Sequence, residues 1–80
     1  MSALKEWDLE VDARGLMCPL PLLKLKMGLQ QLDAGQVIRV MATDPAATLD
    51  FGVFANQVGH TLLVQQQTEE CLVFLIRKGG

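Results

Sequence analysis

The chain has few residues that could bind a metal ion or join two of its segments covalently. Its 80 residues contain two cysteines and one histidine, and no tyrosine. Cys18 and Cys71 form no C-x-x-C pair, and with His60 they supply too few soft ligands for a zinc site. Cysteines this far apart in a reducing compartment are more often free thiols than a disulfide. We therefore expect no metal site and two independent thiols.

Long apolar runs and clustered basic residues are also lacking. No apolar run approaches the ~20 residues of a membrane-spanning helix, and residues 1–7 lack the basic-then-apolar order of a signal peptide. The formal net charge is −2 and the lysines and arginines are scattered, whereas non-specific nucleic-acid binding needs a clustered basic surface. We expect a cytoplasmic protein that makes no direct contact with nucleic acid or membrane.

Apolar residues make up half of the chain, which suffices for one packed core and predicts a single domain over residues 1–80. The alternation of Trp7, Leu9 and Val11 with acidic residues is typical of a half-buried strand. The strands that we expect are 7–11, 36–42, 61–66 and 71–77, and the helices begin at Pro19 and after Thr43-Asp44-Pro45.

Apolar residues recur at helical spacing after each of these two proline helix starts. The first stripe is Leu22, Leu25, Leu29 and Leu32, and the second is Ala47, Phe51, Phe54 and Val58, after which Gly59 ends the helix. The order β-α-β-α-β-β predicts an α+β two-layer sandwich with both helices packed on one face of the sheet. Since both helices follow strands that would run parallel, their N-termini should lie on a common rim.

The tetrapeptide Cys18-Pro19-Leu20-Pro21 places a thiol at the expected start of the first helix. Because proline fits the first helical turn, Cys18 is the expected cap and Pro19 the first helical residue. A thiol there faces the positive end of the helix dipole and the free amides of Leu20 and Leu22, which favours the thiolate. The alternative is a small buried cysteine that merely precedes a helix.

Four further residues are candidates to support this thiol. Pro19 and Pro21 remove two amide donors, and we expect them to hold the helix start rigid. Arg14 could add positive charge near the sulfur, or it could be a solvated turn residue. Asp44 is expected to cap the second helix, and the alternative is that it faces a partner across the rim.

Two residues that could carry chemistry are interpreted as structural. His60 follows a helix stop and has no serine or cysteine beside it, so we expect it to enter a strand. Cys71 is expected within the last strand, in register with Val73 and Leu75. A thiol–disulfide or peroxide-reducing enzyme would need Cys71 to approach Cys18.

The segment Asp12-Ala13-Arg14-Gly15-Leu16-Met17-Cys18-Pro19-Leu20-Pro21-Leu22-Leu23-Lys24 resembles the signature of the TusA/SirA family of small bacterial sulfur carriers. The similarity continues at Gly35-Gln36, at Thr43-Asp44-Pro45 with the downstream Asp50, and at Ile76-Arg77-Lys78-Gly79-Gly80, so it covers nearly the whole chain. The resemblance implies a mixed four-stranded sheet with two helices on one side. It also implies that Cys18 carries sulfur as a persulfide.

In such carriers a pyridoxal-phosphate cysteine desulfurase or a rhodanese-like transferase loads the sulfur. An acceptor protein then removes it for tRNA thiolation, molybdenum-cofactor chemistry or sulfur oxidation. The resemblance implies a monomeric sulfurtransferase-type carrier that binds no cofactor and completes no turnover of its own. Leu20 occupies the position where members of the tRNA-thiolation relay carry an acidic residue.

Two other functions remain open on the sequence. The chain ends in Gly79-Gly80, the terminus of ubiquitin-like carriers that hold sulfur as a C-terminal thiocarboxylate. Those carriers begin with a β-hairpin, whereas here each of the first two strands leads into a helix. A non-catalytic interaction or regulatory domain, in which Cys18 merely caps a helix, is the second alternative.

Overall fold

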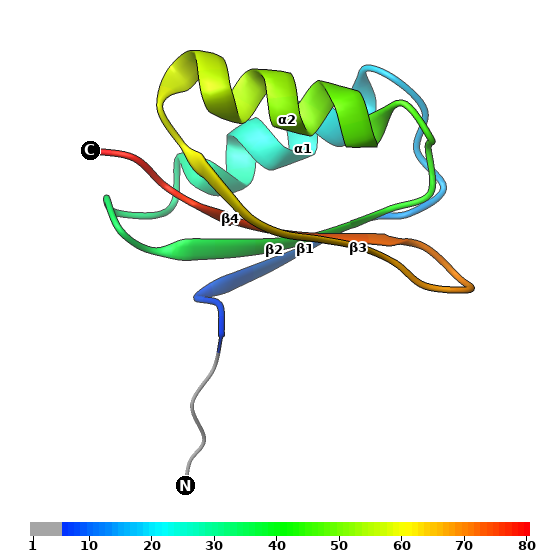
Figure 1. Cartoon of the computed structure of the whole chain (residues 1–80), viewed down its shortest axis with the longest axis horizontal. Helices are drawn as coiled ribbons and strands as arrows, with labels where there is room; N and C mark the ends of the chain where they lie inside the picture. Colours follow the sequence, from blue (N-terminus) through cyan, green and yellow to red (C-terminus); the bar gives the residue numbers. More distant parts are fainter. Residues whose placement is uncertain (1–5) are drawn as a thin grey trace, which may run out of the picture.

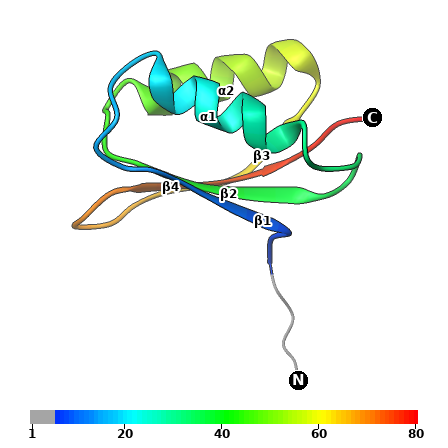
Figure 2. The ribbon, with the colours of Figure 1, turned by 180° about the vertical axis from the view of Figure 1, so that it is seen from behind.

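A computed structural model describes residues 6–80 as a four-stranded sheet with two helices (Figure 1). In chain order the elements are β1 (Leu9–Ala13), α1 (Leu20–Leu29), β2 (Val37–Ala42), α2 (Ala47–Val58), β3 (Thr61–Gln67) and β4 (Leu72–Arg77). Both helices lie on the same face of the sheet, as the view from behind also shows (Figure 2). The predicted two-layer α+β fold is confirmed. Residues 1–5, most of the segment that lacks a signal-peptide pattern, lie outside the described residues.

The sheet is mixed, with the strand order β1-β2-β4-β3. β1 and β2 are parallel, while β4 is antiparallel to both β2 and β3. Ala13 pairs with Ala42, and Ala42 pairs with Leu72, so β1 and β2 end at the same edge at which β4 begins. Because the connections to both helices leave from this edge, we call it the helix-start edge (Figure 1).

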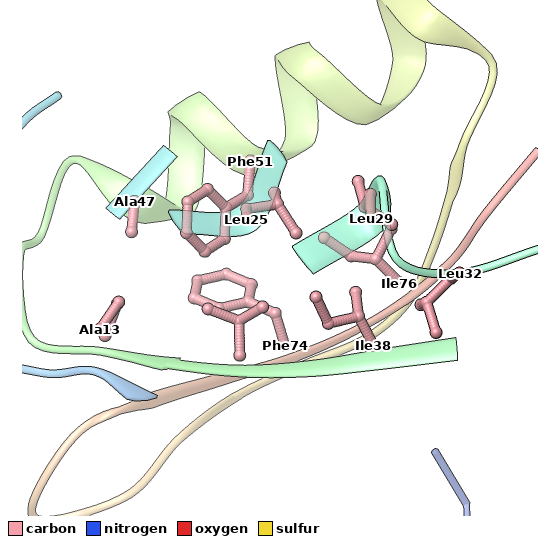
Figure 3. Packing of buried hydrophobic residues seen from close by; sticks show 11 residues of the cluster. Ala13, Leu25, Leu29, Leu32, Ile38, Ala47, Phe51, Phe74 and Ile76 are labelled. Carbon is pink, nitrogen blue, oxygen red and sulfur yellow. The ribbon is translucent and has the colours of Figure 1, made fainter. Parts of the chain in front are cut away.

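The core lies between the helices and the sheet (Figure 3). Leu25, Leu29 and Leu32 are buried as the first stripe predicted. From α2, Phe51 packs edge-to-face against Phe74 of β4, with 4.7 Å between the ring centroids. The second stripe was wrong at its end, since Val58 is 57 % exposed. Val58 is the last helical residue, and the smaller Ala55, one turn after Phe51, takes the buried place.

Each strand differs from its predicted range by one or two residues at one or both ends. β1 begins at Leu9 rather than Trp7; just before it, the Asp8 amide donates to the Val37 carbonyl, while the Val37 amide donates to the side chain of Asp8. Cys71 lies outside β4, so its predicted place in that strand was wrong. Its backbone closes the β3–β4 turn instead: the Thr68 amide donates to the Cys71 carbonyl, and the Cys71 amide donates to the Thr68 hydroxyl.

Candidate functional site

Cys18 lies before α1 rather than at its cap. The helix begins at Leu20, with Pro19 at the N-cap position and Pro21 buried in the first turn. The amide of Leu20 donates to the carbonyl of Met17 at 2.8 Å, so residues 17–20 form a tight turn before the helix. The predicted cap was therefore one residue too early, and the amide of Leu20 is not free to donate to the sulfur. Cys18 itself is exposed and its thiol is free.

Asp44 joins the Cys18 turn to the start of α2. Its Oδ2 accepts the amide of Cys18 at 2.6 Å, and its Oδ1 accepts the amide of Ala46 at 3.0 Å. The side chain is only 6 % exposed, so both hydrogen bonds are largely shielded from water. The prediction that Asp44 caps α2 was wrong, since the N-cap is Ala46; Asp44 binds the amide of that N-cap residue from two positions earlier. Its bond to Cys18 shows that the two helix starts share one rim, as the strand order predicted.

Asp50 is the residue that sequence reasoning missed. It lies in the first turn of α2, and the Cys18 thiol donates to its Oδ2 with 3.7 Å between sulfur and oxygen. The sequence carried one signal for it: a carboxylate early in a helix that starts at the same edge as Cys18. The prediction used Asp50 only as part of the family resemblance.

The surroundings of Cys18 disfavour the thiolate in the free protein. Loss of water around the sulfur, followed by the negative charge and hydrogen bond of Asp50 and by the charge of Asp44, raises the pKa of Cys18 above its ordinary value. The expectation that the helix dipole would favour the thiolate was therefore wrong. The physical reason is the loss of water around the sulfur, together with the negative charges of Asp50 and Asp44.

Comparison with known proteins identifies the family. A family model described as Sulfurtransferase TusA matches residues 9–78. The chain belongs to the TusA family. It is 43 % identical over 75 residues to a "Sulfur carrier protein TusA" of Allochromatium vinosum, covering 94 % of this chain and 99 % of that one. A Pseudomonas putida protein with the same description is 41 % identical over 71 residues, which are 89 % of each chain.

The fold agrees with this membership. The crystal structure of a SirA-like protein from Desulfitobacterium hafniense superposes with a TM-score of 0.78 at 23 % identity. The superposition covers 91 % of this chain and all of that chain, so the two proteins share one fold. TusA-family membership supports a sulfur carrier or sulfur-transfer function for this chain.

In this TusA-family chain, Arg14 forms an ion pair with Asp12, two residues earlier in the sequence. Its guanidinium makes two hydrogen bonds of 2.9 Å to the carboxylate of Asp12, which also accepts the Arg14 amide. This contact lowers the pKa of Asp12 to about 2 and raises the pKa of Arg14. The carboxylate of Glu70 at the β3–β4 turn also acts to raise the pKa of Arg14. Arg14 lies in the turn that follows β1, with its guanidinium bound to the carboxylate of Asp12.

Cys71 lies at the β3–β4 turn, and His60 lies just before β3. Cys71 is half-buried and lines a shallow cleft between the β3–β4 turn and Thr43, Pro45 and Thr48 at the start of α2. His60 accepts the amide of Gly79 on Nδ1 at 2.9 Å, and its ring packs against Phe54. His60 thus fastens the C-terminal segment next to β3.

Two features are absent among residues 6–80. No group of three or more His, Cys, Asp or Glu side chains converges there as metal ligands would. No helix in that range is long and apolar enough to cross a bilayer.

Proposed function

We propose that the Sγ atom of Cys18 carries sulfur as a persulfide from a donor protein to an acceptor protein. The observation that carries this proposal is an exposed thiol whose backbone is anchored by a buried carboxylate. The 2.6 Å bond from the Cys18 amide to Asp44 fixes the turn, while the side chain stays accessible. A carrier needs this combination because a second sulfur must reach Sγ along a defined approach.

The proposed cycle consists of two thiol exchanges that balance without an oxidant or a cofactor. The Cys18 thiolate attacks the terminal sulfur of the donor persulfide, the S–S bond of the donor breaks, and the donor thiolate leaves. An acceptor thiolate then attacks the terminal sulfur on Cys18, and the Cys18 thiolate leaves. Each proton lost by an attacking thiol is taken up by the departing thiolate or by water. Cys18 ends as it began, which suits a carrier.

The proposed donor is a cysteine desulfurase or a rhodanese-like transferase, and the carrier acts as a monomer in the cytoplasm. Free thiols persist in a reducing compartment, and both cysteines are free in the structure. Met17 and Leu20, on either side of the Cys18-Pro19 dipeptide, are both large and exposed, so a protein that reaches Sγ would also contact these apolar side chains. Pro19 and Pro21 are proposed to keep the turn and the helix start rigid.

Intact-mass analysis tests the proposal. After incubation with a cysteine desulfurase and cysteine, the wild-type protein should gain one sulfur atom, and a reductant should remove it. Cys18→Ala should gain none, because the attacking atom is missing. Cys71→Ala is the matched control and should load like the wild type. Loading that survives in Cys18→Ala, or that is lost only in Cys71→Ala, would overturn the proposal.

A further inference from the structure

Two negatively charged side chains contact Cys18. Asp50 of α2 contacts the sulfur, and Asp44 of the β2–α2 connection contacts the Cys18 amide. The cations nearest in sequence act elsewhere. Arg14 is paired with Asp12, which Lys24 also faces, and Lys26 lies over the ring of Phe54 at 5.4 Å. The thiol is accessible. Among the described residues, no cation forms an ion pair with Asp44 or Asp50 that would offset their negative charge.

We propose that Asp50 is a positioning residue that holds Cys18 as a neutral thiol in the free carrier, and that cationic side chains of the sulfur-exchange partner release it. This inference rests on the proposed function, since it concerns the proteins that exchange sulfur with Cys18. The partner is thereby assigned a chemistry: lysine or arginine placed beside its own reactive sulfur.

The geometry gives Asp50 two effects on the exchange. As a hydrogen-bond acceptor 3.7 Å from Sγ, it orients the S–H group and favours the protonated form. As a fixed negative charge, it opposes the thiolate that must form before sulfur can be attacked. A cation that enters the rim with the partner interacts favourably with Asp50 and with the developing thiolate at once. Reactivity would then appear on docking rather than in the free protein.

Holding the thiol neutral also has a chemical advantage for a carrier. Oxidation and non-specific disulfide exchange follow thiolate character and exposure. Cys18 is exposed, so its protection must come from a low thiolate fraction rather than from burial. Asp50 adds to this protection while Cys18 stays exposed.

Small disulfides of opposite charge test the proposal without the need to know the partner. In a Cys71→Ser background, where Cys18 is the one remaining thiol, the rate of exchange is measured with cystamine, which is cationic, and with 3,3′-dithiodipropionate, which is anionic. We expect the cationic disulfide to react faster, and we expect Asp50→Asn to reduce the ratio of the two rates by roughly two- to fivefold, the range of an exposed ion pair. Asp50→Glu keeps the charge and should keep the ratio. Asp33→Asn removes an equal charge beyond the far end of α1 and should leave it unchanged.

Alkylation by neutral iodoacetamide gives the second measurement. Across a pH series, Asp50→Asn should move the rise in the Cys18 rate to lower pH, because one of the charges that oppose the thiolate is gone. An unchanged profile, an unchanged ratio of disulfide rates, or an Asp50→Glu variant that behaves like Asp50→Asn would overturn the inference. The proposed function is tested by a separate measurement. It fails if Cys18→Ala still gains sulfur, and that result does not depend on Asp50.

Discussion

At the scale of single residues, the site depends on a carboxylate that is itself almost inaccessible. Asp44 accepts one amide from the Cys18 turn and one from the start of α2, so a single side chain holds two connections together. A buried acceptor with two donors is costly to replace, because each donor left unpaired keeps its desolvation penalty.

Asp44→Asn should therefore destabilise the protein by about 1–3 kcal/mol, because the side-chain NH₂ group would face one of the two amide donors. Urea denaturation followed by circular dichroism measures the change. Asp33→Asn is the control, since it is an equal change in the connection between α1 and β2, at an exposed side chain. It should shift the free energy of unfolding by less than about 0.5 kcal/mol. Equal effects of the two substitutions would contradict the bridging role of Asp44.

The pair of Asp12 and Arg14 predicts a dependence on pH. Asp12 has a pKa of about 2 in the folded protein, below its ordinary 3.8, so the pair adds stability that is present above about pH 4. This contribution is lost as the pH falls through about 2. An NMR titration should show the pKa of Asp12 returning toward its ordinary value in Arg14→Ala. A pKa that remains near 2 in this variant would show that Arg14 is not its cause.

At the scale of elements, two helical glycines have opposite surroundings. A Cβ atom on Gly28 of α1 would lie 2.5 Å from Cδ1 of Ile38 and 3.1 Å from Cγ2 of Val11, whereas a Cβ on Gly52 of α2 would meet nothing within 4 Å. Ile38 is fully buried and has little room to move. Gly28 therefore permits the close packing of α1 on the sheet, while Gly52 only weakens α2.

Gly28→Ala and Gly52→Ala should accordingly change stability in opposite directions. Gly52→Ala should stabilise by about 0.5–1 kcal/mol, through the higher helix propensity of alanine. Gly28→Ala gains the same propensity but incurs an overpacking cost of about 1–3 kcal/mol, so a net loss is expected. Thermal unfolding of the two variants checks the prediction. A stabilised Gly28→Ala would mean that the helix and sheet can separate without cost at this point.

Much of this element structure could be predicted from the sequence, because it follows from periodicity. The element order and the stripe of Leu25, Leu29 and Leu32 needed only local patterns. The position of Cys18 could not be predicted in the same way. The tight turn from Met17 to Leu20 and the bond from Asp44 are tertiary features, and the acceptor of the thiol, Asp50, is 32 residues away along the chain.

At the scale of the whole molecule, the two features that could hold sulfur lie at opposite edges of the sheet. β4 starts at the helix-start edge, where Leu72 pairs with Ala42, and ends at the far edge, where Arg77 pairs with Val37. The C-terminal Gly79-Gly80 therefore leaves the sheet at the end opposite to the helix-start edge (Figure 1). Gly79 is held by His60, and a Cβ there would lie 2.0 Å from the carbonyl oxygen of Gly59, so the segment packs closely against the end of α2.

Two C-terminal truncations separate a structural role of this segment from a chemical one. Deleting Gly79 and Gly80 removes the bond to His60 and should cost about 0.5–1.5 kcal/mol of stability, while deleting Gly80 alone should cost almost nothing. Both truncated proteins should still gain one sulfur atom from a cysteine desulfurase, because Cys18 and its two carboxylates are intact. A C-terminal thiocarboxylate forms only after ATP and an adenylating enzyme activate the carboxylate. If sulfur were held there, loading would need both of these additions and would be abolished by deleting Gly80 alone, with the fold and Cys18 untouched. Intact mass and urea denaturation of the same two variants therefore decide which end of the molecule carries the sulfur.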